Sequence, residues 1–206
     1  MKKLVFWLFV LMFVSVSVAF SFPGFKTRDS VKLGIEFSYP KRLKVWEKDG
    51  RIIIEHKISF EHPNPCDGSG LSRYEKSKKI FDFYVEMSIL EKTPNEIFVQ
   101  EVMGVKNGVT VLRNSVRVTF GDLDGFRVYN GNHGCGPYSY FFQLTNSNNA
   151  KQRVKFLRVD RFPAPEFREL SEEEKQIFYR LREIISPKNE EDIFKEILNS
   201  LKWSQQ

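Results

Sequence analysis

Between residues 32 and 162 the sequence consists mainly of short runs in which apolar and polar residues alternate. In the run 81–90, every second residue is Phe, Val, Met or Ile, and the residues between them are mostly polar. A period of two is typical of β-strands that bury one face. Turn-forming residues separate neighbouring runs, and short links join strands that run in opposite directions. The sequence therefore predicts an antiparallel sheet.

The predicted strands cover residues 32–39, 43–46, 51–60, 81–90, 109–120, 126–129, 138–144 and 153–162, with a bulge or turn near residues 113–115. Asp49-Gly50 is a hairpin turn signal, and residues 122–125 are expected to form a hairpin loop. His56 falls on the apolar face of its run. We interpret it as a core or edge histidine with a hydrogen-bond partner rather than as a metal ligand.

Helical signals flank or follow the strands. Thr93, Pro94 and Glu96 form a capping box with proline at the first helical position, which predicts a short helix that ends at Gly104. Two further helices are expected near the end of the chain, and the last has an inward stripe of Ile193, Phe194, Ile197, Leu198 and Leu201. Strands followed by helices predict an α+β fold, an antiparallel sheet flanked by helices.

The N-terminal segment has the pattern of a signal peptide. Lys2 and Lys3 precede an uncharged stretch, residues 4–25, whose most apolar part is residues 4–14. Small residues allow cleavage after Ala19 or Ser21. We therefore expect residues 1–21 to be a signal peptide and residues 22–206 a single exported domain, periplasmic or extracellular. The alternative is an uncleaved segment that anchors the protein, which would be its one contact with a membrane.

Charge and motifs argue against several classes of function. The formal charge is +6, and removal of Lys2 and Lys3 leaves +4, which is too small and too scattered to predict nucleic-acid binding. The chain has no Gly-x-Ser-x-Gly, no phosphate-binding glycine loop and no His-Glu-x-x-His, and it has three histidines in all. We therefore expect no enzymatic activity and no cofactor.

The chain has two cysteines, Cys66 and Cys135, and each lies among glycine and proline residues with a histidine shortly upstream. An exported protein with an even number of cysteines normally oxidises them, so we predict a Cys66–Cys135 disulfide. Closing a loop of about 70 residues would stabilise the fold by roughly 4 kcal/mol in the chain-entropy description.

A metal or redox site is the alternative at the same residues. His62, Cys66, His133 and Cys135 would supply two imidazoles and two thiolates, a ligand set that suits zinc or copper. A histidine beside a cysteine can also lower the pKa of the thiol, which favours thiol redox chemistry. Free thiols and a disulfide exclude each other, so one sample can separate these predictions.

Two stretches resemble the ends of PsbP-like proteins. Phe37-Ser38-Tyr39-Pro40-x-x-Leu43-x-Val45 resembles their opening strand, and Phe194-x-x-Ile197-Leu198-x-Ser200-Leu201-Lys202-Trp203 resembles their closing helix. The resemblance implies an α/β/α sandwich. It also implies a role without catalysis, since family members are mostly non-enzymatic. They include accessory subunits of photosystem II, a Ran-binding protein and many exported bacterial proteins or lipoproteins.

We therefore expect an exported binding or accessory protein of the cell envelope. Its partner would be another envelope protein or a small ligand. It would be held near the two stretches rich in glycine and proline that contain Cys66 and Cys135, the cysteine segments. The basic run around residues 73–79 and nearby histidine and tyrosine side chains would form the binding surface, which comprises His62, Arg73, Lys76, Lys78, Lys79, His133, Tyr138 and Tyr140.

Overall fold

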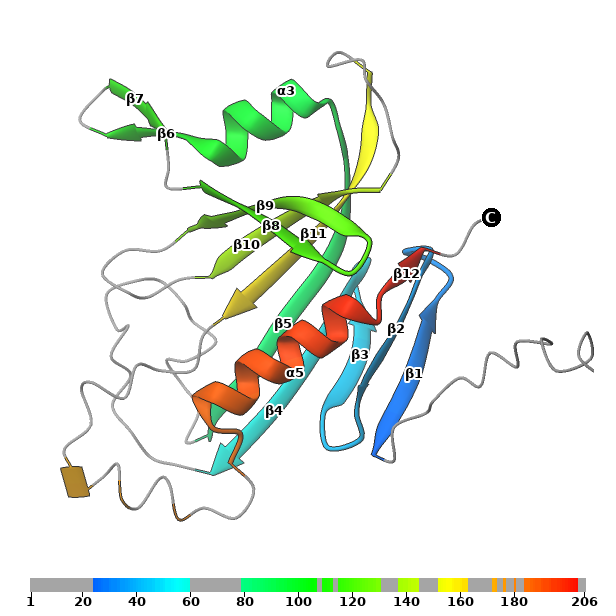
Figure 1. Ribbon diagram of the computed structural model, residues 1–206, viewed down its shortest axis with the longest axis vertical. Coiled ribbons are helices and arrows are strands. Elements are labelled where there is room, and N and C mark those ends of the chain that lie inside the picture. Colours follow the sequence, from blue (N-terminus) through cyan, green and yellow to red (C-terminus); the bar gives the residue numbers. More distant parts are fainter. Residues whose placement is uncertain are drawn as a thin grey trace, which may run out of the picture.

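A seven-stranded antiparallel sheet forms the centre of the computed structural model (Figure 1). The structure describes residues 24–59, 79–106, 109–112, 115–130, 137–144, 152–162, 172–173, 176, 180 and 184–203. The strand order is β3-β4-β5-β11-β10-β9-β8. The strands are β3 (Lys44–Lys48), β4 (Arg51–Ser59), β5 (Lys79–Lys92), β8 (Ser115–Phe120), β9 (Leu123–Tyr129), β10 (Tyr138–Gln143) and β11 (Val154–Phe162). The prediction of an antiparallel sheet is confirmed.

Local sequence explains the hairpins of this sheet. Asp49 and Gly50 join β3 to β4 with φ angles of 51° and 72°, the positive values that a two-residue hairpin turn needs. The break predicted near residues 113–115 separates two strands, since β7 (Val109–Leu112) pairs with β6 (Met103–Lys106) and β8 belongs to the large sheet. The predicted start of β9 was wrong: the strand begins at Leu123, because the turn from β8 is shorter than the predicted loop.

A second, three-stranded sheet has the order β1-β2-β12, with β1 (Phe25–Ser30), β2 (Ile35–Pro40) and β12 (Lys202–Trp203). The sequence did not predict β1 or β12. The predicted strand 32–39 begins later, at Ile35, because residues 31–34 form the turn between β1 and β2. Gly34 closes that turn with φ of 65°, and its N–H donates to the carbonyl oxygen of Ser30 at 2.8 Å.

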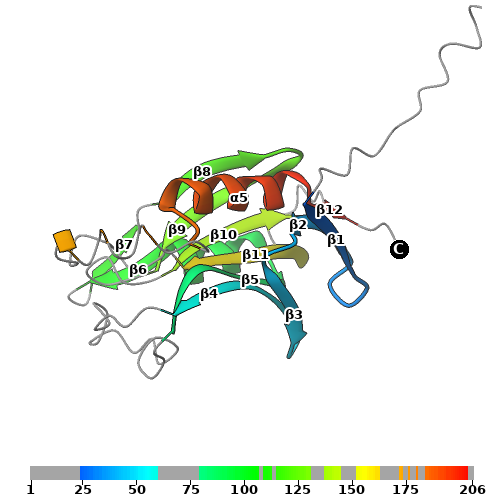
Figure 2. The ribbon, with the colours of Figure 1, turned by 90° about the horizontal axis from the view of Figure 1, so that it is seen from below.

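The C-terminal helix α5 (Pro187–Asn199) covers one face of the large sheet (Figure 2). Its predicted stripe is confirmed, because Ile193, Phe194, Ile197, Leu198 and Leu201 are buried in the main core. They meet apolar residues from the same face of the sheet, which include Ile52, Ile54, Phe83, Val85, Met87, Leu157 and Val159. The helix predicted just before α5 falls mostly outside the described residues.

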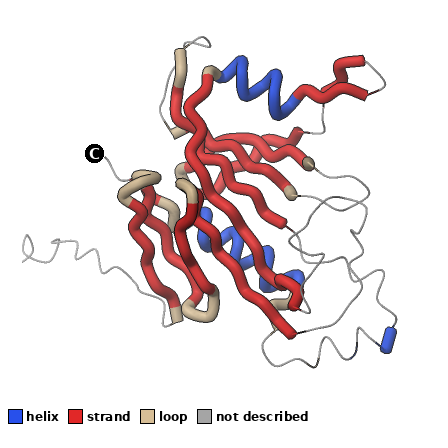
Figure 3. The backbone as a smooth tube through the Cα atoms, turned by 180° about the vertical axis from the view of Figure 1, so that it is seen from behind, coloured by secondary structure: helices blue, strands red, loops and turns tan. Residues whose placement is uncertain are grey.

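On the opposite face, which is turned to the viewer in Figure 3, the short helix α3 (Pro94–Ile97) continues into a π-helical turn, η2 (Phe98–Val102). The predicted capping box is present: Glu96 N–H donates to Thr93 Oγ1 at 3.1 Å, and Thr93 N–H donates to Glu96 Oε2 at 2.7 Å. Ile97 and Val102 pack on Phe141, Val128 and neighbouring residues. The part of the chain that the structure describes is therefore an α+β fold.

The predicted signal peptide, residues 1–21, lies outside the described residues. Within the described ranges, no helix is both long and apolar enough to cross a membrane.

Candidate functional site

Both cysteine segments depart from the same edge of the large sheet. Ser59 and Lys79, which flank the first segment, are the last register pair of β4 and β5. Asn130 and Pro137 flank the second segment, and the Asn130 N–H donates to the Pro137 carbonyl oxygen at 2.9 Å. Strand β11 also ends at this edge. The points where the two segments begin and end therefore lie at the same end of the antiparallel strands.

Most of the predicted site residues lie outside the described residues: His62, Cys66, Arg73, Lys76, Lys78, His133 and Cys135. The Cys66–Cys135 disulfide and the alternative metal site therefore stay predictions. Among the described residues, no group of three or more His, Cys, Asp or Glu side chains could hold a metal ion.

The two predicted tyrosines have different environments. Tyr138 is half-buried, with its ring 5.1 Å from the ring of Tyr129 and the Arg127 guanidinium 5.1 Å from its centroid. Tyr140 is 2% exposed, and its ring lies 5.0 Å from that of Phe194 in α5. The structure therefore places Tyr140 in the core and corrects its assignment to the binding surface. It faces α5 because it pairs with Val159 on the inner face of the sheet.

A β-bulge beside this edge turns an acidic side chain inward. The register passes from His56↔Phe83 to Lys57↔Phe81, so Asp82 has no partner on β4. Its fully buried carboxylate lies 2.6 Å from His56 Nδ1 and accepts a hydrogen bond from the Ile185 N–H at 2.7 Å. Asp82 thus connects β4 and β5 to the segment that leads into α5. The interpretation of His56 as a core or edge histidine with a hydrogen-bond partner is confirmed, and its side chain is half-buried.

A buried ion pair joins the start of α5 to β11. Arg161 Nε and Nη2 donate to Glu190 Oε1 and Oε2 at 2.8 and 2.5 Å. The Arg161 guanidinium also lies 4.9 Å from the centroid of the Phe194 ring. Two parallel bonds to one carboxylate fix the angle of both side chains. The pair therefore holds the first turn of α5 in register with the sheet.

The surroundings shift the pKa of both partners. Burial raises the pKa of the Glu190 carboxyl, and the bonds from Arg161 act in the opposite direction without cancelling that effect. Burial lowers the pKa of the Arg161 guanidinium, but the bonds to Glu190 outweigh burial and raise it overall. The guanidinium therefore stays charged inside the fold.

Three carboxylates are buried in the described part of the chain, and each has partners. Asp82 and Glu190 have those given above. Glu55, 4% exposed, lies 3.4 Å from Lys57 Nζ and 3.9 Å from Lys44 Nζ. Glu55 joins β4 to β3 through Lys44, whereas Lys57 lies on the same strand as Glu55. Asp82 and Glu190 tie neighbouring elements together as described above, so a structural role accounts for all three carboxylates.

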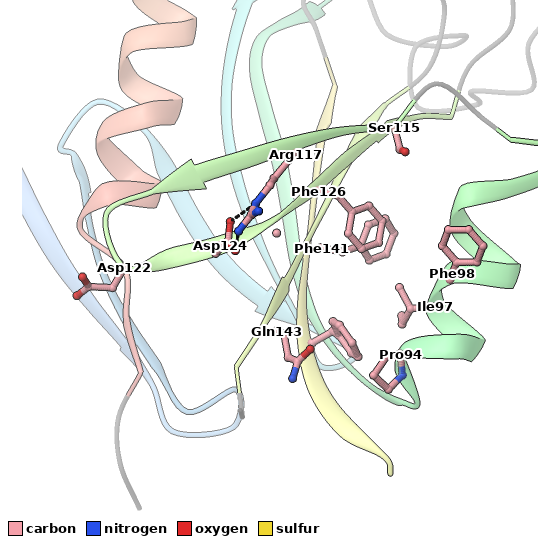
Figure 4. A pocket seen from close by; sticks show the side chains of 12 residues that line it. Pro94, Ile97, Phe98, Ser115, Arg117, Asp122, Asp124, Phe126, Phe141 and Gln143 are labelled. Atoms are coloured by element: carbon pink, nitrogen blue, oxygen red, sulfur yellow. Dashed lines mark hydrogen bonds and ion pairs between the residues drawn. The ribbon is translucent and has the colours of Figure 1, made fainter. Parts of the chain in front are cut away.

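A pocket of about 720 Å³ lies on the face of the sheet opposite α5 (Figure 4). It lies between α3, η2 and the strands β8 to β11. The rings of Phe126 and Phe141 form its floor, stacked with centroids 5.1 Å apart and planes 21° apart. The lining residues are Pro94, Ile97, Phe98, Ser115, Arg117, Asp122, Asp124, Gly125, Phe126, Phe141, Gln143 and Phe156.

The rim of the pocket contains an exposed ion pair. Arg117 Nε and Nη2 donate to Asp124 Oδ1 and Oδ2 at 3.2 and 2.6 Å, and Thr119 Oγ1 donates to Asp124 Oδ1 at 3.3 Å. The bonds from Arg117 lower the pKa of the Asp124 carboxyl. Asp124 therefore stays ionised and paired at neutral pH.

Sequence reasoning missed this pocket. A signal was present in β10, where Tyr140, Phe141 and Phe142 are consecutive and so must bury rings on both faces of the sheet. Tyr140 and Phe142 face α5, and Phe141 lies on the other face of the sheet.

No family model matches the chain, and no curated protein matches it. Among solved structures, a crystal structure from Bacteroides thetaiotaomicron VPI-5482 matches with a TM-score of 0.42 and 10% sequence identity. The match covers 88% of this chain and 49% of that chain, so this chain spans about half the length of that structure.

Proposed function

We propose that the chain is an exported, non-catalytic binding or accessory protein of the cell envelope, with a PsbP-like α/β/α sandwich fold and a Cys66–Cys135 disulfide. The observation that carries this proposal is the set of paired buried carboxylates. Each of these carboxylates contacts a side chain on another element: Asp82 contacts His56 on β4, Glu55 contacts Lys44 on β3, and Glu190 contacts Arg161 on β11. Catalytic carboxylates instead need access to a substrate.

The two motifs that resemble PsbP-like proteins are direct neighbours in space, which supports the fold part of the proposal. Lys202 and Trp203 pair with Glu36 and Ile35 in β2. The Ser38 N–H donates to Ser200 Oγ at 2.8 Å. These contacts fix the end of the closing helix to the opening strand.

The shared edge of the sheet supports the binding surface. Because both cysteine segments depart from it, residues far apart in the sequence have a common anchor there. A disulfide between Cys66 and Cys135 would join the segments next to Tyr138. A metal held by His62, Cys66, His133 and Cys135 is the alternative at the same two segments.

Photo-crosslinking tests the binding surface. A benzophenone amino acid replaces Tyr138 in one variant and Val31 in the other, which is 73% exposed on the turn between β1 and β2. The proposal expects a discrete adduct in the native envelope from position 138 and none from position 31. The same pattern of adducts from both positions, or no adduct from either, would count against a binding surface at this edge.

A further inference from the structure

The pocket on the face opposite α5 differs from the binding surface proposed near the cysteine segments, since none of its lining residues belongs to either segment. Its floor consists of Phe126 and Phe141, and Phe98 stands across from them on η2 (Figure 4). Its volume of about 720 Å³ falls within the range of roughly 300–1,000 Å³ that small-molecule sites occupy. The pocket is therefore large enough for a molecule with one or more rings.

The wall that carries Phe98 has an unusual backbone. Residues Phe98–Val102 form a π-helical turn, and the Met103 N–H donates to the Phe98 carbonyl oxygen. Such turns are rare and occur frequently at functional sites. Here the turn begins at Phe98, one of the residues that line the pocket, and the Phe98 side chain is 48% exposed. An exposed aromatic side chain opposite an aromatic floor is a ready contact for a flat ring.

The charges of the lining indicate what kind of ring would fit. Arg117 and Asp124 neutralise each other through two hydrogen bonds. Asp122, the remaining charged side chain of the lining, points away from the aromatic floor (Figure 4). A charged ligand would lose its hydration at the floor without gaining an unpaired counter-charge there, which makes its binding unfavourable.

We propose that this pocket binds one flat, uncharged, ring-containing apolar molecule between Phe98 and the Phe126–Phe141 floor. This inference goes beyond the proposed function, because it requires neither the disulfide nor an envelope partner. Burial of apolar surface drives the binding, and ring contacts with Phe98 orient the ligand.

Fluorescence titration of the purified protein with N-phenylnaphthylamine, an uncharged aromatic probe, tests the proposal. We expect saturable binding of one probe per chain. Phe98→Ala should weaken it about three- to tenfold, the loss expected for one aromatic contact. Val99→Ala is the matched control, because Val99 is the next residue of the same turn, 58% exposed and absent from the lining. It should bind as the unchanged protein does.

Anilinonaphthalene sulfonate, a similar ring system that carries a negative charge, tests the preference for uncharged ligands and should bind more weakly than the neutral probe. Thermal unfolding of both variants checks that neither has lost its fold. Three results would overturn the proposal: no saturable binding of the neutral probe, equal effects of the two substitutions, or equal affinity for the charged probe.

Discussion

At the scale of single residues, Asp82 shows how one inserted position determines a local arrangement. The bulge at Asp82 changes which residues of β5 face α5, and it places a carboxylate where two donors converge. One donor is the backbone N–H of Ile185, which is present whatever side chain residue 185 carries. The position therefore favours an acceptor of the length and charge of aspartate.

Asp82→Ala should lower the free energy of unfolding by about 1–3 kcal/mol, because it leaves the buried Ile185 N–H without an acceptor. Urea denaturation measures the change. Glu191→Ala is the control, since it removes an exposed pair with Lys195 on α5 and should cost no more than about 0.5 kcal/mol. Equal losses for the two variants would show that the Asp82 contacts add nothing beyond a surface pair.

At position 125, on β9, the structure leaves no room for a side chain larger than that of glycine. A Cβ atom there would lie 2.1 Å from the carbonyl oxygen of Phe141 and 2.9 Å from Phe142 Cδ1. Gly125→Ala should therefore destabilise the protein by roughly 1–3 kcal/mol, the usual cost of overpacking. Ser115→Ala, at an exposed position of the neighbouring strand, should stay within about 0.5 kcal/mol. Thermal or urea unfolding that places both variants together would contradict the close approach of β9 and β10.

At the scale of elements, the two helices are fixed to opposite faces of the sheet by different means. Helix α5 combines an apolar stripe with the Arg161–Glu190 ion pair. Helix α3 is short and depends more on its capping box, in which Thr93 and Glu96 bond to each other's backbone N–H groups. Stability at the pocket wall should thus depend on the charge of Glu96.

The Thr93 N–H lowers the pKa of Glu96 in the folded protein. The contribution of the Glu96 carboxylate to stability is therefore present above the pKa that Glu96 has in the unfolded chain. It is lost as the pH falls through the lower pKa that Glu96 has in the folded protein. The stability advantage of the unchanged protein over Glu96→Gln should shrink between about pH 6 and about pH 3. Urea unfolding of both proteins across this range measures it. A difference that stays constant with pH would mean that the Glu96 carboxylate is not bonded at the cap.

The ion pair of α5 calls for a double-mutant cycle. Glu190→Leu leaves the Arg161 guanidinium buried without its counter-charge and should cost about 3–5 kcal/mol. The double variant Glu190→Leu/Arg161→Met replaces both charges with apolar groups and should be more stable than the single variant. Denaturation of the two single variants and the double variant gives the interaction energy. Additive losses would contradict a direct bond.

At the scale of the whole molecule, the sequence predicted what depends on local pattern. The strands of the large sheet, the Asp49-Gly50 turn, the capping box and the stripe of α5 follow from periodicity and turn chemistry. Strand β1 was missed because Phe25–Ser30 is mostly polar and shows no alternation, and β12 was missed because two residues carry no period. Both strands exist through pairing with β2.

The sites depend even more on contacts between distant residues. The bulge at Asp82 and the Arg161–Glu190 pair join positions that no local rule connects. The pocket requires α3 and η2 to lie over β8–β11, which the pattern of each element alone does not specify. Of the predicted binding surface, Tyr138 lies beside the sheet edge, and Tyr140 belongs to the core.

We propose an exported binding protein whose two cysteine segments are joined by a disulfide. The most direct test is the intact mass of the exported protein before and after reduction with alkylation, with a metal assay on the same sample. We expect a chain that begins at Phe20 or Phe22, a native mass lower by the two hydrogens lost on oxidation, and no bound metal. Two reactive thiols with one bound metal would contradict it and move the function to His62, Cys66, His133 and Cys135.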